Sequence, residues 1–182
     1  MKMSFSGAPE VLAPLAHVWP RLLDPHFVAR HGPGVESVEV LDPHHFKVLC
    51  GFGVGSIKLR FGLDVELSNV NPPNYFAMKV RGKAPGSAVE VTADLALEPI
   101  DADRTRLRWT AESEISGTVA SVGARLMEGT ARKLTEQFWT RFAASLGEAG
   151  SPPEPAPLSP DPSAPPAPPP PDAPATEPPA PA

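Results

Sequence analysis

Residues 56–67 read SIKLRFGLDVEL, and apolar and polar side chains alternate along the whole stretch. One set holds six apolar residues: Ile57, Leu59, Phe61, Leu63, Val65 and Leu67. The other set is small or charged: Ser56, Lys58, Arg60, Gly62, Asp64 and Glu66. Successive side chains of a strand point to opposite faces. The pattern therefore predicts a strand that is buried on one face and solvated on the other, as in an antiparallel sheet.

The same alternation continues on both sides of this stretch. It predicts further strands at residues 35–41, 45–54, 75–82, 88–98 and 105–115. Proline, glycine, asparagine and aspartate separate these segments, which is the chemistry of turns. We therefore expect a meander of six strands, and the N-terminal residues from Phe5 to Leu12 would add a seventh.

The period changes near residue 118. From there to residue 146 the apolar positions have helical spacing: Val119, Val122, Leu126, Thr130, Leu134, Phe138 and Phe142. The opposite stripe is charged: Arg125, Glu128, Arg132 and Glu136. This pattern predicts one long C-terminal helix of roughly 25–29 residues that lies on the sheet. Two shorter helices, broken at Asp24-Pro25, are expected before the meander, and Pro20 should kink or shorten the first of them.

A strongly curved antiparallel sheet around one long helix accounts for this order of elements, so the predicted fold class is α+β. The residues themselves leave open whether the core is fully packed or holds an apolar cavity. Gly123 and Gly129 fall inside the predicted helix, where glycine costs about 1 kcal/mol relative to alanine. Several apparently inward side chains, such as Met78 and Ala93, are small or flexible.

Alternate turns of a meander lie at the same end of the sheet. The turns at 53–56, 85–86 and 116–117 should therefore share one end, together with residues 31–34. This glycine-rich end is the expected mouth of any cavity. Its predicted rim residues are Gly53, Val54, Gly55, Pro85, Gly86 and Gly117.

The composition changes sharply after this domain. Residues 151–182 contain 16 prolines and no lysine, arginine or aromatic residue. Such a segment buries too little apolar surface to offset its chain entropy. We predict a folded domain at 1–148 and a disordered Pro/Ala-rich acidic tail at 149–182. With the tail's four acids set aside, 16 basic and 17 acidic residues remain, which argues against nucleic acid as a partner.

The sequence shows no signal peptide, no membrane span and no set of cysteines that could form disulfides. The N-terminal residues have no apolar run long enough for a signal peptide, and no segment approaches the ~18 apolar residues of a membrane span. Cys50 is the only cysteine, so a disulfide framework is excluded. An intracellular protein without a membrane span is the simplest expectation.

No catalytic or metal motif emerges from the chain. Residues 51–58, GFGVGSIK, lack the spacing of a phosphate-binding loop, and a strand follows them where a helix would be needed. The five histidines show no metal-ligand spacing. We therefore predict no catalytic residues and no metal site, and Cys50 is expected to be a buried, inert thiol.

Three segments together resemble the CoxG family of carbon monoxide dehydrogenase subunits, which belongs to the START-like, or SRPBCC, superfamily. They are GPGVESVEVLDPHHFKV from Gly32, GVGSIKLRFGLDVELSNVNPPNYFAMKVRGKAPGS from Gly53, and SVGARLMEGTARKLTEQFW from Ser121. The resemblance runs from about Phe5 to Leu146. One departure is visible, because residues 30–34 read RHGPG where the family usually has Cys-Ile-Pro-Gly.

The resemblance implies a helix-grip fold, with seven strands cupped around the long helix and an apolar cavity between them. It also implies a non-enzymatic accessory protein of a molybdenum-containing carbon monoxide dehydrogenase or related hydroxylase. Such a protein would bind a hydrophobic ligand, such as a respiratory quinone or a lipid, and link the enzyme to the inner face of the cytoplasmic membrane. The expected cavity residues are Phe46, Val48, Phe52, Phe61, Met78, Val91, Trp109, Val122, Leu126 and Met127.

Two alternatives remain open at this point. A ligand-free adaptor or maturation factor would have a fully packed interior. An enzyme of the polyketide cyclase or dehydratase type, which shares the superfamily fold, would need polar groups that converge inside the cavity. The expected localisation is cytoplasmic and peripheral to the membrane, with Phe52 and Val54 as candidates for the membrane contact. No covalent cofactor is expected.

Overall fold

The computed structural model describes residues 1–147, which form eight strands, three α-helices and one 3-10 helix. The strands are β1 Lys2–Gly7, β2 Glu10–Val11, β3 Val35–Asp42, β4 His45–Val54, β5 Ile57–Asn71, β6 Tyr75–Ala84, β7 Ser87–Asp101 and β8 Arg104–Gly117. The helices are α1 Leu15–Leu23, α2 Pro25–His31, the 3-10 helix η1 Thr118–Val122, and α3 Ala124–Gly147. The predicted tail and its boundary at residue 148 lie outside the described residues.

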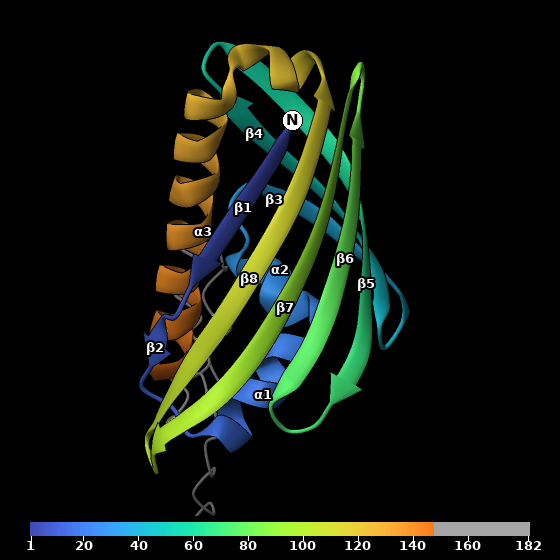
Figure 1. Cartoon of the computed structure of the whole chain (residues 1–182). Coiled ribbons are helices and arrows are strands. Elements are labelled where there is room, and N and C mark those ends of the chain that lie inside the picture. The colour runs from blue at the N-terminus through green and yellow to red at the C-terminus, as the bar shows by residue number, and fades with distance from the viewer. Residues whose placement is uncertain (148–182) are drawn as a thin grey trace, which may run out of the picture. The chain divides into compact units, whose positions relative to one another are not determined.

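One antiparallel sheet contains all eight strands, in the order β1-β8-β7-β6-β5-β4-β3, with β2 also paired to β8 (Figure 1). The six-strand meander predicted from alternation is confirmed as β3 to β8. In β5, Phe61 and Val65 are buried, whereas Lys58 and Arg60 on the opposite face are exposed. The period of two therefore identified the buried face correctly.

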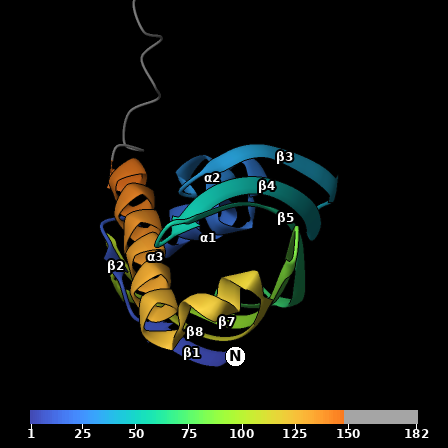
Figure 2. The ribbon, with the colours of Figure 1, turned by 90° about the horizontal axis from the view of Figure 1, so that it is seen from above.

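The sheet curves strongly, so that its two edge strands approach each other. Seen from above, α3 lies across the open side of this curve, between the β1 edge and the β3–β4 side (Figure 2). The arrangement confirms the predicted helix-grip architecture. The apolar side chains of α3 pack toward the concave face of the sheet.

The predicted N-terminal strand is two strands. β1 and β2 are separated by Ala8 and Pro9, and both pair with β8. Pro9 has no N–H to donate, but its carbonyl oxygen accepts a 2.9 Å hydrogen bond from the Leu107 N–H. The interruption lets β1 end at Gly7 opposite Trp109.

The prediction of one continuous C-terminal helix from residue 118 was wrong at its start. Residues 118–122 form η1, and α3 begins only at Ala124. Gly123 between them has φ +94°, which a right-handed helix does not contain. Gly123 interrupts the helical conformation of the backbone. The apolar residues before it therefore belong to η1 and those after it belong to α3.

The break predicted between the two short helices is confirmed at Asp24. Its Oδ1 accepts hydrogen bonds from the backbone N–H groups of His26 at 3.0 Å and Phe27 at 3.3 Å. This caps α2, whose first residue is Pro25, a position where the missing N–H costs nothing. Pro20 does not end α1, which continues through it to Leu23.

The interior consists of two clusters of buried side chains. The lower cluster in Figure 1 joins α1, α2 and the last turns of α3 to β7 and β8, with Val18, Leu107 and Phe142 fully buried. The upper cluster joins β4, β5 and β8 to η1 and the start of α3, around Phe61 and Val119. Met78 packs against both clusters. Among residues 1–147, no helix has the length and apolar character needed to cross a membrane.

Candidate functional site

An apolar pocket of about 340 Å3 lies between the sheet and α3, where the two core clusters meet. The sheet, α2, α3 and the residues around them all contribute to its wall. The lining residues are Leu22, Val28, Pro33, Phe46, Leu67, Phe76, Met78, Val91, Ala93, Leu95, Trp109, Ala111, Leu134, Thr135, Phe138 and Trp139. None of these side chains is titratable, and Thr135 already donates its hydroxyl to the Ala131 carbonyl at 2.8 Å.

The structure brings together four of the ten residues expected to line a cavity. They are Phe46, Met78, Val91 and Trp109, and they come from β4, β6, β7 and β8. The strand alternation placed them on the concave face, and the curvature of the sheet makes them converge.

Five others belong to the packed upper cluster and do not line this pocket. They are Val48, Phe52, Phe61, Val122 and Met127. The Phe52 and Phe61 rings stack, with centroids 5.0 Å apart and planes 8° apart. These side chains therefore pack within the upper cluster and lie outside the lining of the apolar pocket.

Leu126 does not face the interior, contrary to the sequence prediction. Its side chain is 43% exposed. Leu126 and Leu134 are eight residues apart in α3, which places them roughly 80° apart around the helix axis at 3.6 residues per turn. Met127, one residue later, points inward instead and is buried.

The glycine-rich turns do meet at one end, but their rim is not the mouth of this pocket. The Thr118 N–H donates a 2.8 Å hydrogen bond to the Gly86 carbonyl, which fixes η1 over the turn between β6 and β7. Val54 and Val119 are each 1% exposed there, so Val54 cannot form the exposed apolar edge that we predicted. None of Gly53, Val54, Gly55, Pro85, Gly86 and Gly117 lines the apolar pocket.

Sequence reasoning expected Val122, Leu126 and Met127 of the predicted C-terminal helix at the cavity, and it missed the helix residues that line the pocket. Leu134, Phe138 and Trp139 of α3 and Leu22 and Val28 of α1 and α2 form part of its wall. The signal was present for Leu134 and Phe138, because both lie on the predicted apolar face of the C-terminal helix. For the short helices, no local pattern indicates which side chains reach the sheet.

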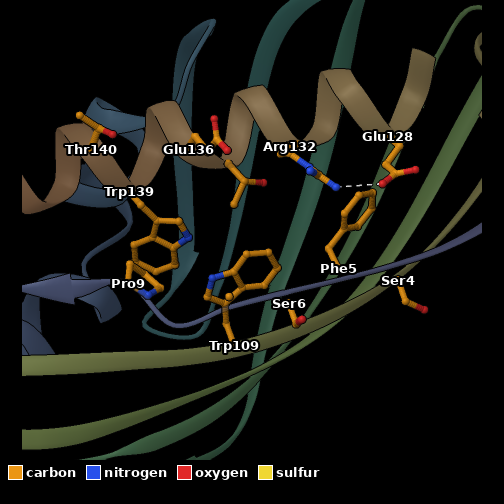
Figure 3. A pocket seen from close by; sticks show the side chains of 12 residues that line it. Ser4, Phe5, Ser6, Pro9, Trp109, Glu128, Arg132, Glu136, Trp139 and Thr140 are labelled. Atoms are coloured by element: carbon orange, nitrogen blue, oxygen red, sulfur yellow. Dashed lines mark hydrogen bonds and ion pairs between the residues drawn. The ribbon is translucent and has the colours of Figure 1, made fainter. Parts of the chain in front are cut away.

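A groove of about 560 Å3 lies beside the pocket, between β1 and α3 (Figure 3). Phe5, Pro9, Trp109 and Trp139 supply its apolar surface. Hydroxyl and charged side chains form the remaining wall: Ser4, Ser6, Glu128, Arg132, Thr135, Glu136 and Thr140. The charges are partly neutralised, because Arg132 Nη2 lies 3.0 Å from Glu128 Oε1.

Trp109 lies at the boundary of the two hollows and lines both. Its indole Nε1 is buried and, in the described residues, has no hydrogen-bond partner. An unpaired buried donor costs about 1–3 kcal/mol. Within residues 1–147 it is the one buried side-chain nitrogen or oxygen atom without a hydrogen-bond partner.

The titratable groups elsewhere do not add a reactive centre to the pocket. Burial, reinforced by the charge of Glu36, raises the pKa of the Cys50 thiol, which keeps it protonated and unreactive. His45, Asp64 and Glu66 have ligand atoms within 4.8 Å of one another. They lie partly exposed on β4 and β5, away from the pocket lining, and His45 Nε2 is already 3.0 Å from Asp64 Oδ1.

The apolar pocket can hold an apolar molecule, and its lining has no titratable side chain, whereas the carboxylates of Glu128 and Glu136 lie in the adjoining groove. Burying each methylene contributes about 0.8 kcal/mol, so even a short hydrocarbon chain in the pocket gains substantial affinity. A group that transfers protons would have to come from outside the pocket lining.

Comparison with solved structures identifies the fold. A conserved protein from Geobacillus kaustophilus aligns with a TM-score of 0.76 and 24% identity, over 81% of this chain and 97% of that one. The ZhuI aromatase/cyclase from Streptomyces sp. R1128 aligns with a TM-score of 0.64 and 16% identity, over 83% and 97%. A START superfamily protein from Mycobacterium smegmatis aligns with a TM-score of 0.63 and 10% identity, over 80% and 98%. The fold is therefore START-like.

Comparison of the sequence with family models identifies one family. No curated protein sequence matched the chain. The family model of CoxG, a carbon monoxide dehydrogenase subunit, matches residues 7–147, which include the apolar pocket and almost every described element. This chain belongs to the CoxG family of carbon monoxide dehydrogenase subunits.

Proposed function

We propose that this protein is a non-enzymatic carrier of a hydrophobic ligand, and that it serves a molybdenum-containing carbon monoxide dehydrogenase or a related hydroxylase. The observation that carries the proposal is the apolar pocket between sheet and α3, whose lining holds no titratable side chain. The CoxG family name supports an association with carbon monoxide dehydrogenase.

A respiratory quinone is the ligand that we favour over a general lipid. A dehydrogenase without a membrane span of its own must pass electrons to an acceptor dissolved in the bilayer. A pocket that shields a prenyl tail from water would let the quinone reach the enzyme. The pocket volume of about 340 Å3 holds part of such a molecule, and the adjoining groove offers room for the rest.

We propose further that the carrier works at the inner face of the cytoplasmic membrane through its glycine-rich end. Leu126 is the exposed large apolar side chain at this end, and its Cδ2 atom lies over Gly55. Arg125 precedes it in α3, and Lys58 lies near the start of β5, and both cations are exposed. An apolar side chain flanked by cations suits a transient contact with anionic lipids.

Solvent extraction of the purified full-length chain tests the carrier function. Mass spectrometry of the extract should find a quinone or another lipid in amounts comparable to the protein. Stripped protein that is mixed with quinone-loaded vesicles and then separated from them should regain the quinone. If the extract is empty and vesicles transfer nothing, the carrier proposal is wrong, and a ligand-free adaptor is the remaining interpretation.

An enzyme of the cyclase type is less well supported. The ZhuI aromatase/cyclase shares the fold, but at 16% identity this likeness concerns the fold alone. Cyclisation and dehydration need proton transfer by a positioned side chain. The lining of the apolar pocket provides none.

A further inference from the structure

The groove between β1 and α3 and the apolar pocket share a wall. Trp109, Thr135 and Trp139 line both hollows. Figure 3 shows the Trp109 and Trp139 indoles between the β1 segment and α3, with Phe5 further along the same groove. A molecule longer than the pocket can therefore extend past these rings into the groove.

The β1–α3 seam has fewer polar cross-links than the glycine-rich end. No hydrogen bond or ion pair joins β1 to α3 within residues 1–147. The glycine-rich end, in contrast, is closed by η1, where the Val119 N–H donates to Ser87 Oγ at 3.1 Å and the Thr118 N–H donates to Gly86 O. Widening the seam breaks apolar contacts only, whereas opening the other end breaks hydrogen bonds as well.

The groove differs from the pocket in chemistry. Aromatic rings provide a flat apolar surface, and the hydroxyls of Ser4 and Ser6 lie at the edge. The charged lining residues are two carboxylates, Glu128 and Glu136, and one guanidinium, Arg132. Their net charge is negative, which disfavours an anionic phosphate group and favours an uncharged head group.

Trp109 supplies a buried hydrogen-bond donor without a partner at the boundary, in the part of the chain that the structure describes. Its Nε1 lies against Gly7, so close that a Cβ atom placed on this glycine would be 2.7 Å from it. In this position the donor is unsatisfied. If the indole turns away from Gly7, Nε1 can donate to an acceptor in the groove and recover the lost hydrogen bond.

We infer that the β1–α3 groove is the entry port and head-group site of the carried ligand. The ligand is an uncharged amphiphile with a flat, carbonyl-bearing ring and an apolar tail. The ring lies in the groove and accepts a hydrogen bond from Trp109 Nε1, and the tail lies in the pocket. This inference rests on the proposed carrier function and adds where the ligand enters and which residue selects its head.

Two probes and three forms of the full-length protein test it. The probes are a prenylated naphthoquinone and a prenyl hydrocarbon of the same tail length without a head group. The proteins are wild type, Trp109→Phe, which keeps an aromatic ring but loses the donor, and Trp139→Phe, which makes the same change at the other shared tryptophan. Partition of each probe from vesicles is measured by mass spectrometry after separation.

Trp109→Phe should lower the affinity for the quinone roughly 3- to 10-fold more than it lowers the affinity for the hydrocarbon, which is the difference expected for one hydrogen bond. Trp139→Phe should leave the ratio of the two affinities as in wild type. Both probes are measured on the same variant. A loss of folded protein therefore lowers both apparent affinities alike and leaves their ratio unchanged. The melting temperature of Trp109→Phe should not fall below that of Trp139→Phe, because an unsatisfied donor has been removed.

The outcomes separate the two proposals. If wild type binds the quinone and Trp109→Phe binds it equally well, the head-group site is wrong and the carrier function stands. If wild type takes up neither probe, the carrier function itself fails. If Trp109→Phe lowers both affinities by the same factor, Trp109 packs against the tail and does not select the head.

Discussion

At the scale of single residues, the pairing of Trp109 with Gly7 shapes the candidate site. Gly7 of β1 lies opposite Trp109 of β8 in the register of the two strands. The Trp109 indole packs against β1 at Gly7, where β1 has no side chain. The alternation of residues 105–115 already places Trp109 on the concave face. Nothing local to either residue shows that they meet, because they are far apart in the sequence.

Gly7→Ala tests this pairing. The added Cβ would lie 2.7 Å from Trp109 Nε1, so the indole must move. We expect a loss of about 1–3 kcal/mol in the free energy of unfolding from overpacking, and a shifted tryptophan emission maximum. Because the ring is already displaced from its closed position, quinone uptake from vesicles should become faster.

Gly62→Ala is the matched control, since a Cβ atom at this glycine would have no atom within 4 Å. Gly62→Ala should leave the tryptophan emission maximum and the rate of quinone uptake from vesicles as in wild type. Equal behaviour of the two variants would show that Gly7 does not hold the Trp109 ring in place.

At the scale of elements, the C-terminal helix shows how one backbone angle overrides a side-chain pattern. The apolar spacing of residues 119–142 predicts a single helix. Gly123, at φ +94°, divides it into η1 and α3. The division leaves residues 118–122 in η1, which closes the upper end of the core with Val119.

Two glycine-to-alanine changes separate backbone conformation from packing. A Cβ atom would meet nothing within 4 Å at either Gly123 or Gly129, so the two positions differ in backbone angle alone. Gly129 is inside α3, and Gly129→Ala should raise the free energy of unfolding by about 0.5–1 kcal/mol. Gly123→Ala should lower it by about 1–2 kcal/mol, because alanine resists the left-handed region.

Urea unfolding of both variants beside wild type measures the difference. A stabilising Gly123→Ala would mean that residues 118–146 can form one continuous helix in solution, as the spacing alone predicts.

At the scale of the whole domain, residues 1–147 bury their apolar side chains in two clusters, and the pocket lies where these clusters fail to fill the space between them. α1, α2 and the end of α3 pack one end of the curved sheet, and η1 packs the other. Small side chains such as Ala93 and Ala111 lie on the sheet between them. The hollow therefore follows from the placement of elements that are distant in sequence.

Ala93→Leu should fill part of the pocket from β7. The added methylene and methyl groups enter existing space, so the melting temperature should stay near or above that of wild type. Retained quinone or lipid, measured by extraction, should fall several-fold. Ala88 lies on the exposed face of the same strand. Ala88→Leu should therefore change neither the melting temperature nor the amount of retained ligand. If Ala93→Leu retains as much ligand as Ala88→Leu, the pocket does not hold the tail.

The sequence by itself determined the six strands of the meander, their buried faces, the break at Asp24 and the presence of a C-terminal helix. These are local properties, because alternation, helical spacing and turn residues act over a few neighbouring positions. Its motifs also carry the CoxG resemblance, which the family match confirms.

Only the tertiary structure decided where the pocket lies and which of the candidate residues share it. Phe46, Met78, Val91 and Trp109 converge, whereas Phe61 and Met127 pack in the upper cluster. A periodic pattern fixes the direction of each side chain, but the volume left between opposing faces depends on sheet curvature and on helix position. The Trp109–Gly7 contact and the groove along β1 and α3 are non-local in the same way, so no stretch of the sequence contains them.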